Sequence, residues 1–207
     1  AVRYNADGTV ILADTKNIDS SVTTATNNTG TLSLEGSSTV TGQVGASGAS
    51  LKEINAGVAG TTSTFNSNVY ASNLNMTGAG TVVLNSDLTG NVVTTGNNQG
   101  ILTTTGVNQT ITGNIGSSTS LDLNTLNIGS NTDATNYSKT TINGNVFADS
   151  TVLNNNGTTN SSELILASGK NITSTITTTD ANMGILTLAG GIQTVSGTVG
   201  EDGISLK

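Results

Sequence analysis

The chain has 207 residues and a formal net charge of −7, with no Cys, Pro, His or Trp, 9% charged residues and 2% aromatic residues. These absences argue against a thiol nucleophile, a Ser-His-Asp triad and any metal site built on His or Cys. With six basic residues against 13 acidic ones, we expect no nucleic-acid partner. No apolar run approaches the roughly 20 residues that cross a bilayer.

The remaining composition favours ordered β-structure. Thr, Val and Ile are abundant, and these residues suit strands, whereas disordered chains are usually rich in charge and proline. The lack of cysteine fits either a fold that needs no disulfides or a protein that is exported unfolded. Because the chain starts at Ala1 without Met or a signal peptide and ends within a repeat, we expect a mature or excised segment.

An internal repeat sets the expected organisation of the chain. The clearest match aligns Thr39–Gly45, Thr110–Gly116 and Thr194–Gly200, and the same register aligns Gly30-Thr31-Leu32, Gly100-Ile101-Leu102 and Gly184-Ile185-Leu186. Upstream, it aligns Val10-Ile11-Leu12, Val82-Val83-Leu84 and Leu164-Ile165-Leu166. Residues 1–207 therefore form one segment of about two and two-thirds copies, at about 1–72, 73–153 and 154–207. Length differences fall in the polar stretches 127–138 and 154–162, where we expect loops.

The expected elements are short strands. In chain order they include Val10–Leu12, Thr31–Leu34, Thr39–Thr41 and Leu121–Leu123, each followed by a Gly- or Asn-containing turn. No stretch has a sustained helical stripe. Such a repeat predicts an all-β protein, a parallel β-solenoid (β-helix), with a right-handed coil favoured by chirality. A barrel or a sandwich is the alternative.

The number of turns follows from the repeat length. A copy of about 72 residues divides into three turns of about 24, which gives about nine rungs in all. Val10–Leu12, Leu32 with Leu34, and Leu51 with Ile54 then stack in successive turns, and inward Thr, Ser and Asn form hydrogen-bonded ladders. The absence of proline fits, because interior rungs need their N–H groups for pairing on both edges.

Carboxylates are the only candidates for catalysis. Asp14 and Asp19 are close in sequence and Glu201-Asp202 are adjacent, but neither pair has acidic counterparts in both other copies. We therefore expect corner residues in water and no catalytic residue. A glycan-cleaving β-helix would require two carboxylates on one face inside a groove, whereas isolated corner positions for Asp14, Asp19, Asp87 and Asp122 would exclude it.

Three other features receive a structural interpretation. Asp7-Gly8 and Asp202-Gly203 are expected to be turns, not calcium ligands, and we predict no metal and no cofactor. The runs Thr103–Thr105 and Thr177–Thr179 resemble flat threonine arrays that bind ice, but their irregular occurrence favours ordinary strand surface. Tyr70 and Phe147 follow Asn-Val in two copies and are expected to stack in the core, with an exposed receptor contact as the alternative.

Two runs carry a family resemblance. Gly42–Gly57 and Thr64–Asn75 resemble the passenger repeats of rickettsial surface cell antigens, in the outer-membrane protein A and B group of autotransporters. The likeness extends over all three copies. It implies a right-handed parallel β-helix displayed outside the outer membrane, anchored by a C-terminal barrel that is not among these residues. It supplies no binding motif that transfers to particular positions.

The resemblance also implies a function. We expect a surface rod that acts in adhesion to, or invasion of, host cells, with a host-cell surface protein or glycan as partner. A surface-layer or spacer element that associates laterally with copies of itself is the alternative, and a glycan-cleaving enzyme is a third hypothesis.

Overall fold

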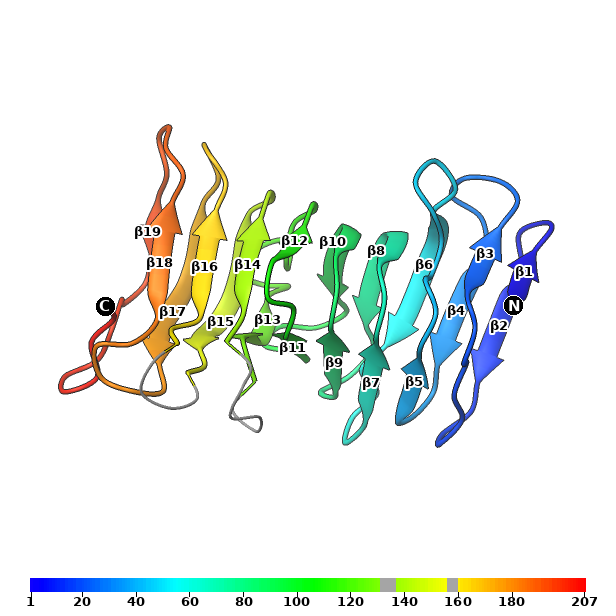
Figure 1. The fold of residues 1–207 in the computed structure, drawn as a ribbon, viewed down its shortest axis with the longest axis horizontal. Helices are drawn as coiled ribbons and strands as arrows, with labels where there is room; N and C mark the ends of the chain where they lie inside the picture. The colour runs from blue at the N-terminus through cyan, green and yellow to red at the C-terminus, as the bar shows by residue number, and fades with distance from the viewer. Residues whose placement is uncertain (131–136, 156–159) are drawn as a thin grey trace.

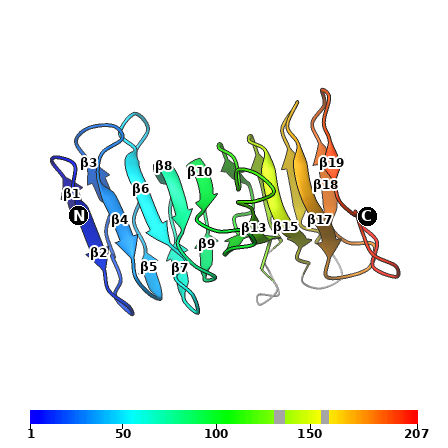
Figure 2. The ribbon, with the colours of Figure 1, turned by 180° about the vertical axis from the view of Figure 1, so that it is seen from behind.

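The computed structural model describes residues 1–130, 137–155 and 160–207, which contain 19 β-strands and no helix. The strands coil around one long axis as a parallel β-solenoid of about eight turns, with the two termini at opposite ends (Figures 1 and 2). The predicted fold class is therefore confirmed, and the number of turns is close to the nine rungs expected. The right hand of the coil stays a prediction.

Each turn contributes strands to long parallel sheets. The nine-stranded sheet contains, in spatial order, β18 (Ile185–Leu188), β16 (Glu163–Leu166), β14 (Lys139–Ile142), β12 (Gln109–Ile111), β10 (Leu88–Thr94), β8 (Val69–Met76), β6 (Leu51–Ala56), β4 (Thr31–Leu34) and β2 (Thr9–Leu12). The eight-stranded sheet contains β19 (Val195–Ser196), β17 (Ile172–Thr178), β15 (Val146–Leu153), β13 (Leu123–Ile128), β11 (Ile101–Thr104), β9 (Thr81–Leu84), β7 (Thr62–Phe65) and β5 (Ser38–Val40). β1 (Val2–Tyr4) pairs separately with β3 (Val22–Thr24).

The core contains three columns of inward side chains, one for each side of the coil, together with further buried residues beside them. The first column is Val10, Leu32, Ile54, Leu74, Val92, Ile115, Val146, Ile172 and Val195. The second is Ile18, Val40, Phe65, Leu84, Thr104, Ile128, Leu153 and Thr178. The third is Val2, Val22, Val44, Val69, Leu88, Ile111, Ile142, Leu166 and Leu188. Val10, Leu32 and Ile54 therefore stack as predicted.

The turns are less uniform than the 24 residues expected, being shorter near the N-terminus and longer farther along, with 26 residues from Val146 to Ile172. Val10 pairs with Leu32 and Leu32 with Ile54, which gives 22 residues per turn, whereas Leu74 to Val92 takes 18. Parts of the expected loops 127–138 and 154–162 lie outside the described residues. Turn length varies because corner loops can lengthen without disturbing the paired strands.

The sequence repeat does not equal three turns. Val40 belongs to the second column, and three turns later that column contains Thr104. Its match in the sequence repeat, Ile111, instead belongs to the third column, and the next match, Val195, belongs to the first. The expected division of each copy into three turns is therefore wrong. A copy takes three turns plus about one third of a turn, so each copy begins on the next side of the coil.

The interior is mainly aliphatic, with polar pairs where threonine or serine points inward. Leu32, Ile54 and Leu74 have no exposed surface. Buried hydroxyls bond along the axis, such as Thr104 with Thr140 at 2.8 Å and Thr151 with Ser174 at 2.8 Å. These bonds are single pairs between turns and not the continuous ladders predicted, and they satisfy polar groups that would otherwise be buried without a partner, as, among the described residues, the hydroxyls of Ser38 and Thr94 are.

Corner conformations recur in all three copies. Asn28, Asn98 and Asn182 adopt positive φ angles of 60°, 48° and 59°, and each is followed two residues later by a glycine with positive φ: Gly30, Gly100 and Gly184. Asn and Gly are the residues that tolerate this left-handed conformation best. The same local turn is therefore rebuilt on three different sides of the coil.

A short hairpin also recurs once per copy. Antiparallel bridges join Ala46 to Ala49, Ser118 to Leu121, and Glu201 to Ile204. The hairpins follow residues of three different sides: Val44 in the third column, Ile115 in the first, and Val199, which pairs with Ile176 beside the second. They therefore leave the coil at successive corners.

Candidate functional site

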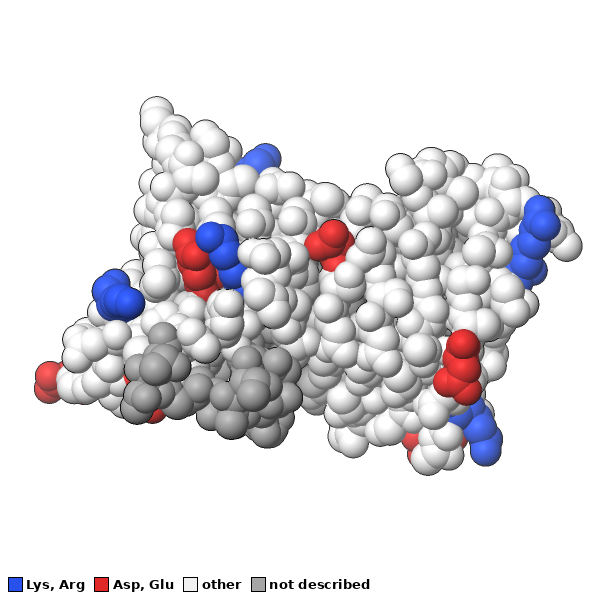
Figure 3. All heavy atoms as spheres, in the orientation of Figure 1, with Lys and Arg blue, Asp and Glu red and all other residues white. Residues whose placement is uncertain are grey.

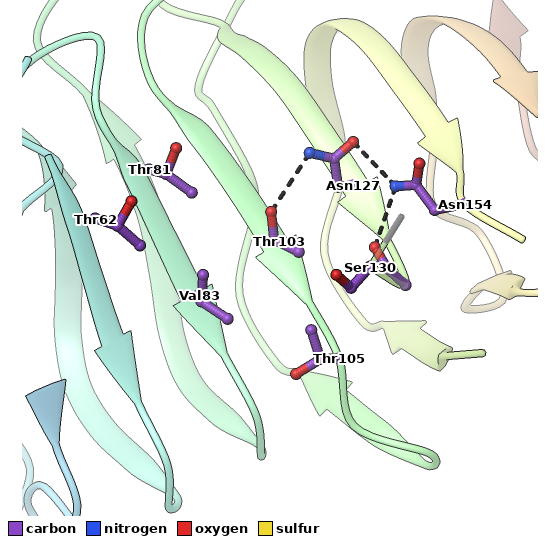
Figure 4. A pocket seen from close by; sticks show the side chains of 9 residues that line it. Thr62, Thr81, Val83, Thr103, Thr105, Asn127, Ser130 and Asn154 are labelled. Carbon is purple, nitrogen blue, oxygen red and sulfur yellow. Dashed lines mark hydrogen bonds between the residues drawn. The ribbon is translucent and has the colours of Figure 1, made fainter. Parts of the chain in front are cut away.

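A groove lies on the outer surface of the eight-stranded sheet. It has a volume of about 370 Å³ and lies over β7, β9, β11 and β13 (Figure 4). Its lining residues are Thr62, Thr81, Val83, Thr103, Thr105, Asn127, Gly129, Ser130 and Asn154. This is the candidate site.

Strand alternation places the threonines of the groove on the outside. In β7 and β9, Ser63 and Val82 are buried, so their neighbours Thr62 and Thr81 point outward. Thr62 lies directly opposite Thr81 in the parallel register. Neighbouring strands are about 4.8 Å apart, which brings the two hydroxyls side by side on the surface.

Two asparagines form one end of the groove. The Asn154 side-chain amide donates to Asn127 Oδ1 at 3.2 Å and to the Gly129 carbonyl at 3.1 Å. Asn127 Nδ2 in turn donates to Thr103 Oγ1 at 3.4 Å (Figure 4). Asn154 is only 4% exposed. This chain of bonds fixes the end wall, because each amide is held by its neighbour.

No charged residue lines the groove. In Figure 3, charged side chains are few on the visible face, with acidic and basic groups next to each other at its left and at its lower right. Hydroxyls, amides and one isopropyl group can form hydrogen bonds and methyl contacts with a ligand, but they supply no acid, base or strong electrostatic attraction. The groove is therefore suited to binding and not to proton transfer.

The threonine runs divide between the two sides of the sheet. In Thr103–Thr105, Thr103 and Thr105 line the groove while Thr104 is buried; in the second run Thr177 points outward and Thr178 is buried. The other two threonines of the groove, Thr62 and Thr81, come from two other turns, so a search within a run of threonines does not find them. Sequence reasoning missed Thr62, Thr81, Asn127 and Asn154, whose only signal is the alternation of each strand.

The carboxylates examined for catalysis act mainly as corner caps. Asp87 Oδ1 accepts from the Thr110 amide at 2.8 Å. Asn17 accepts in the same way from Thr39 at 2.9 Å, and Asn171 from Thr194 at 2.8 Å. The sequence repeat aligns these three pairs, so Asp87 has the structural role that asparagine has in the other copies.

Asp14 and Asp19 also bond to the next turn. Asp14 Oδ1 accepts from the Ser37 amide at 2.8 Å, and Asp19 accepts from the Thr41 hydroxyl at 3.4 Å. Both carboxylates are exposed, as expected for corner residues.

Asp122 is not an isolated corner residue. It accepts from the Asn98 amide at 2.7 Å, but together with Asp149 it lines a second, shallower groove of about 210 Å³. Asp149 follows Ala148, which pairs with Leu123 in the adjacent turn, so the two carboxylates lie near one corner. The sequence did not reveal this pair, because the two residues belong to consecutive turns of unequal length.

The two Asp-Gly sequences lie at turns. Asp202 and Gly203 form the tip of the third hairpin, and Gly203 has a φ of 79°. Asp7 lies in the bend between β1 and β2 and accepts from the Gly30 amide at 3.0 Å. This amide, and then the Lys52 ammonium 3.7 Å away, hold the pKa of Asp7 below its ordinary value. Within the described ranges, no three acidic groups lie close enough to hold a metal ion.

Tyr70 and Phe147 are not in the core, so that prediction is wrong. Each is partly buried on the outer surface, while the preceding residue, Val69 or Val146, fills the interior. The backbone at Gly45 packs directly against Tyr70, and that at Gly116 against Phe147. Each aromatic ring is therefore adjacent to a glycine that leads into one of the recurring hairpins.

The fold and the groove define a β-solenoid with a groove that no charged residue lines. No protein-family model, curated protein or solved structure matches the chain. In the part of the chain that the structure describes, no helix could span a membrane.

Proposed function

We propose that the chain is an adhesive rod of a bacterial surface protein, displayed outside the outer membrane as an autotransporter passenger. The carrying observation is the continuous solenoid, which holds a polar, uncharged groove on a flat sheet face. The resemblance of the repeat to rickettsial surface antigens supports the route of display, with a C-terminal barrel outside these residues. In this role the rod holds contact surfaces away from the bacterial membrane and attaches to a host-cell surface protein or glycan.

Attachment is tested with the purified 207-residue chain on mammalian epithelial cells. A fluorescent label on the chain should give saturable binding that excess unlabelled chain displaces. The control is a protein with the same composition whose repeat copies are divided and joined in scrambled order. If the native chain binds no better than this control, an adhesive role for these residues is wrong, and a spacer or lateral surface-layer element becomes the better proposal.

A glycan-cleaving activity is the second candidate, because Asp122 and Asp149 line one groove. Glycosidases use two carboxylates that face each other across the scissile bond. Glycan cleavage ranks second to adhesion because Asp122 already accepts a backbone hydrogen bond from Asn98. Release of reducing sugars from a panel of polysaccharides, abolished in both Asp122→Asn and Asp149→Asn, would establish it. Activity that survives both changes would exclude this pair.

A further inference from the structure

The surface around the groove is uncharged over four consecutive strands of the eight-stranded sheet. In β7, β9, β11 and β13 the outward residues are all Thr, Val, Ile or Asn, and the first outward charge beyond them is Asp149 in β15. The nine-stranded sheet differs, since Lys139 and Glu163 form an ion pair of 3.0 Å on neighbouring strands. The uncharged surface is therefore confined to the part of the eight-stranded sheet that surrounds the groove.

Two threonine hydroxyls in the groove are free to bond to a ligand, those of Thr62 and Thr81. Within the described ranges, the hydroxyls of Thr62 and Thr81 make no hydrogen bond to another protein group. Thr103 Oγ1 accepts from Asn127, which leaves its own proton available for donation. The groove thus offers donors and acceptors in a row that crosses successive strands.

The lining restricts the chemistry of the ligand. A sulfated or sialylated glycan, an acidic peptide or a nucleic acid would find no basic side chain to neutralise its charge. The apolar surface of the groove comes from Val83 and the threonine methyl groups and lies between hydroxyls and amides, so a purely apolar ligand would leave those polar groups without partners. A neutral sugar carries hydroxyls around its ring and C–H groups on its faces, which match threonine hydroxyls and the methyl groups of Thr and Val.

From this geometry we infer that the groove binds a short segment of a neutral oligosaccharide, with Thr62, Thr81 and Thr103 as hydrogen-bonding residues. The inference rests on the proposed adhesive function and names its ligand class. The volume of about 370 Å³ lies within the range of small-molecule sites. Successive strands, about 4.8 Å apart, repeat at close to the length of one sugar residue, so an extended glycan can follow the axis of the rod.

Binding at one groove is weak, because no aromatic side chain lines it and hydroxyl hydrogen bonds replace bonds to water. Firm attachment then requires many rods on one bacterial surface that engage many glycans at once. The affinity of a single chain for an oligosaccharide is therefore measured at high ligand concentration.

The test is a titration of the isotope-labelled 207-residue chain, followed by backbone and threonine-methyl NMR shifts. The probes are cellohexaose, mannohexaose and lacto-N-neotetraose, with a heparin hexasaccharide as the charged comparison. We expect at least one neutral probe to shift resonances of Thr81, Val83 and Thr103. The double variant Thr62→Val, Thr81→Val should weaken that binding by about tenfold, because two hydroxyl bonds are lost while the β-branched shape is kept.

Thr141→Val is the matched control, because Thr141 points outward from β14 on the other sheet. It should bind the probe like the native chain. Three results would overturn the inference: no neutral probe shifts the groove, the double variant binds unchanged, or heparin binds there more tightly. Since no cells are involved, cell attachment without sugar binding would refute the inference alone, whereas sugar binding without cell attachment would refute the adhesive function alone.

Discussion

The segments Thr39–Gly45 and Thr110–Gly116 have almost the same sequence but lie on different sides of the coil. Val40 pairs with Phe65 in the eight-stranded sheet, whereas Ile111 pairs with Leu88 and Ile142 in the nine-stranded sheet. Both side chains have no exposed surface. The comparison shows that the sequence encodes a local strand-turn unit and not a particular side of the solenoid.

This independence has a physical cause. All three sides present the same environment to a strand: parallel neighbours above and below, and an aliphatic interior. A unit that fits one side therefore fits the next, provided that its corner residues accept the same turn. The following variants test that equivalence, from the largest expected effect to the smallest.

The largest effect is expected in the core. Ile111→Ala should lower the free energy of unfolding by about 2–5 kcal/mol, because it leaves a cavity inside a closed turn. Val40→Ala, at the matching position on another side, should cost about 2 kcal/mol, since it removes fewer methyl groups. Val195, the third match, is only partly buried, and its replacement by alanine should cost about 1 kcal/mol. Urea unfolding measures all three; similar losses at Val195 and Ile111 would contradict this explanation.

The next largest loss of stability is expected when the glycines that precede the hairpins are replaced. A Cβ at Gly45 or Gly116 would run into the carbonyl oxygen of Tyr70 or Phe147, and both glycines have positive φ. Gly45→Ala and Gly116→Ala should each cost about 2 kcal/mol or more. At Gly200 the nearest atom would be 3.7 Å away, so Gly200→Ala should cost only about 1 kcal/mol, the penalty of its left-handed backbone. Thermal unfolding of the three variants gives the comparison, and equal losses would refute a role for the carbonyl contact.

Replacing a side chain that caps a corner should change the free energy of unfolding by a smaller amount. Asp87→Asn should change stability by less than about 0.5 kcal/mol, because Asn17 and Asn171 make the same bond in the other copies. Asp87→Ala should cost about 1 kcal/mol through loss of the bond to the Thr110 amide. If Asp87→Asn destabilised the protein as much as Asp87→Ala, the carboxylate would have a role that the other copies lack.

The smallest expected change in stability comes from Glu163, a residue that differs between the copies. Glu163 stands where the other copies have Thr9 and Thr81. The Thr187 hydroxyl, 2.6 Å from Glu163, and the Lys139 ammonium lower the pKa of this carboxyl below its ordinary value of 4.5. Its stabilising contribution is therefore complete above the unfolded-state pKa and is lost as the pH falls through the lowered folded-state pKa.

Glu163→Gln provides the measurement of that contribution. The native chain should be slightly more stable than this variant near neutral pH, and the difference should shrink below about pH 4.5. Urea unfolding at several pH values measures it. A difference that stayed constant down to about pH 3 would mean that Glu163 does not titrate in this way.

The parallel solenoid could be predicted from the sequence, because its short strands and its turns are each indicated by residues that lie close together in the chain. Gly30, Gly100 and Gly184 mark equivalent turns, and Val10, Leu32 and Ile54 stack in the order that their spacing predicts. The one-third-turn advance of each copy could not be predicted, since it depends on summed corner lengths that vary from turn to turn.

The groove and the aromatic positions could not be predicted for related reasons. Thr62 and Thr81 lie side by side only once the register between β7 and β9 is known, and Thr or Val on a strand surface is otherwise uninformative. Tyr70 and Phe147 each follow a buried valine, and a shift of one residue in the alternation would have placed them inside.

The directions of the hairpins follow from the one-third-turn advance. The copies are related by a screw operation: a rotation of about 120° combined with a rise of roughly 16 Å, as three and a third turns of about 4.8 Å require. Three consecutive copies therefore present the same hairpin in three directions. A rod built in this way offers its repeated feature to any approaching surface, whichever way the rod happens to be rotated about its long axis.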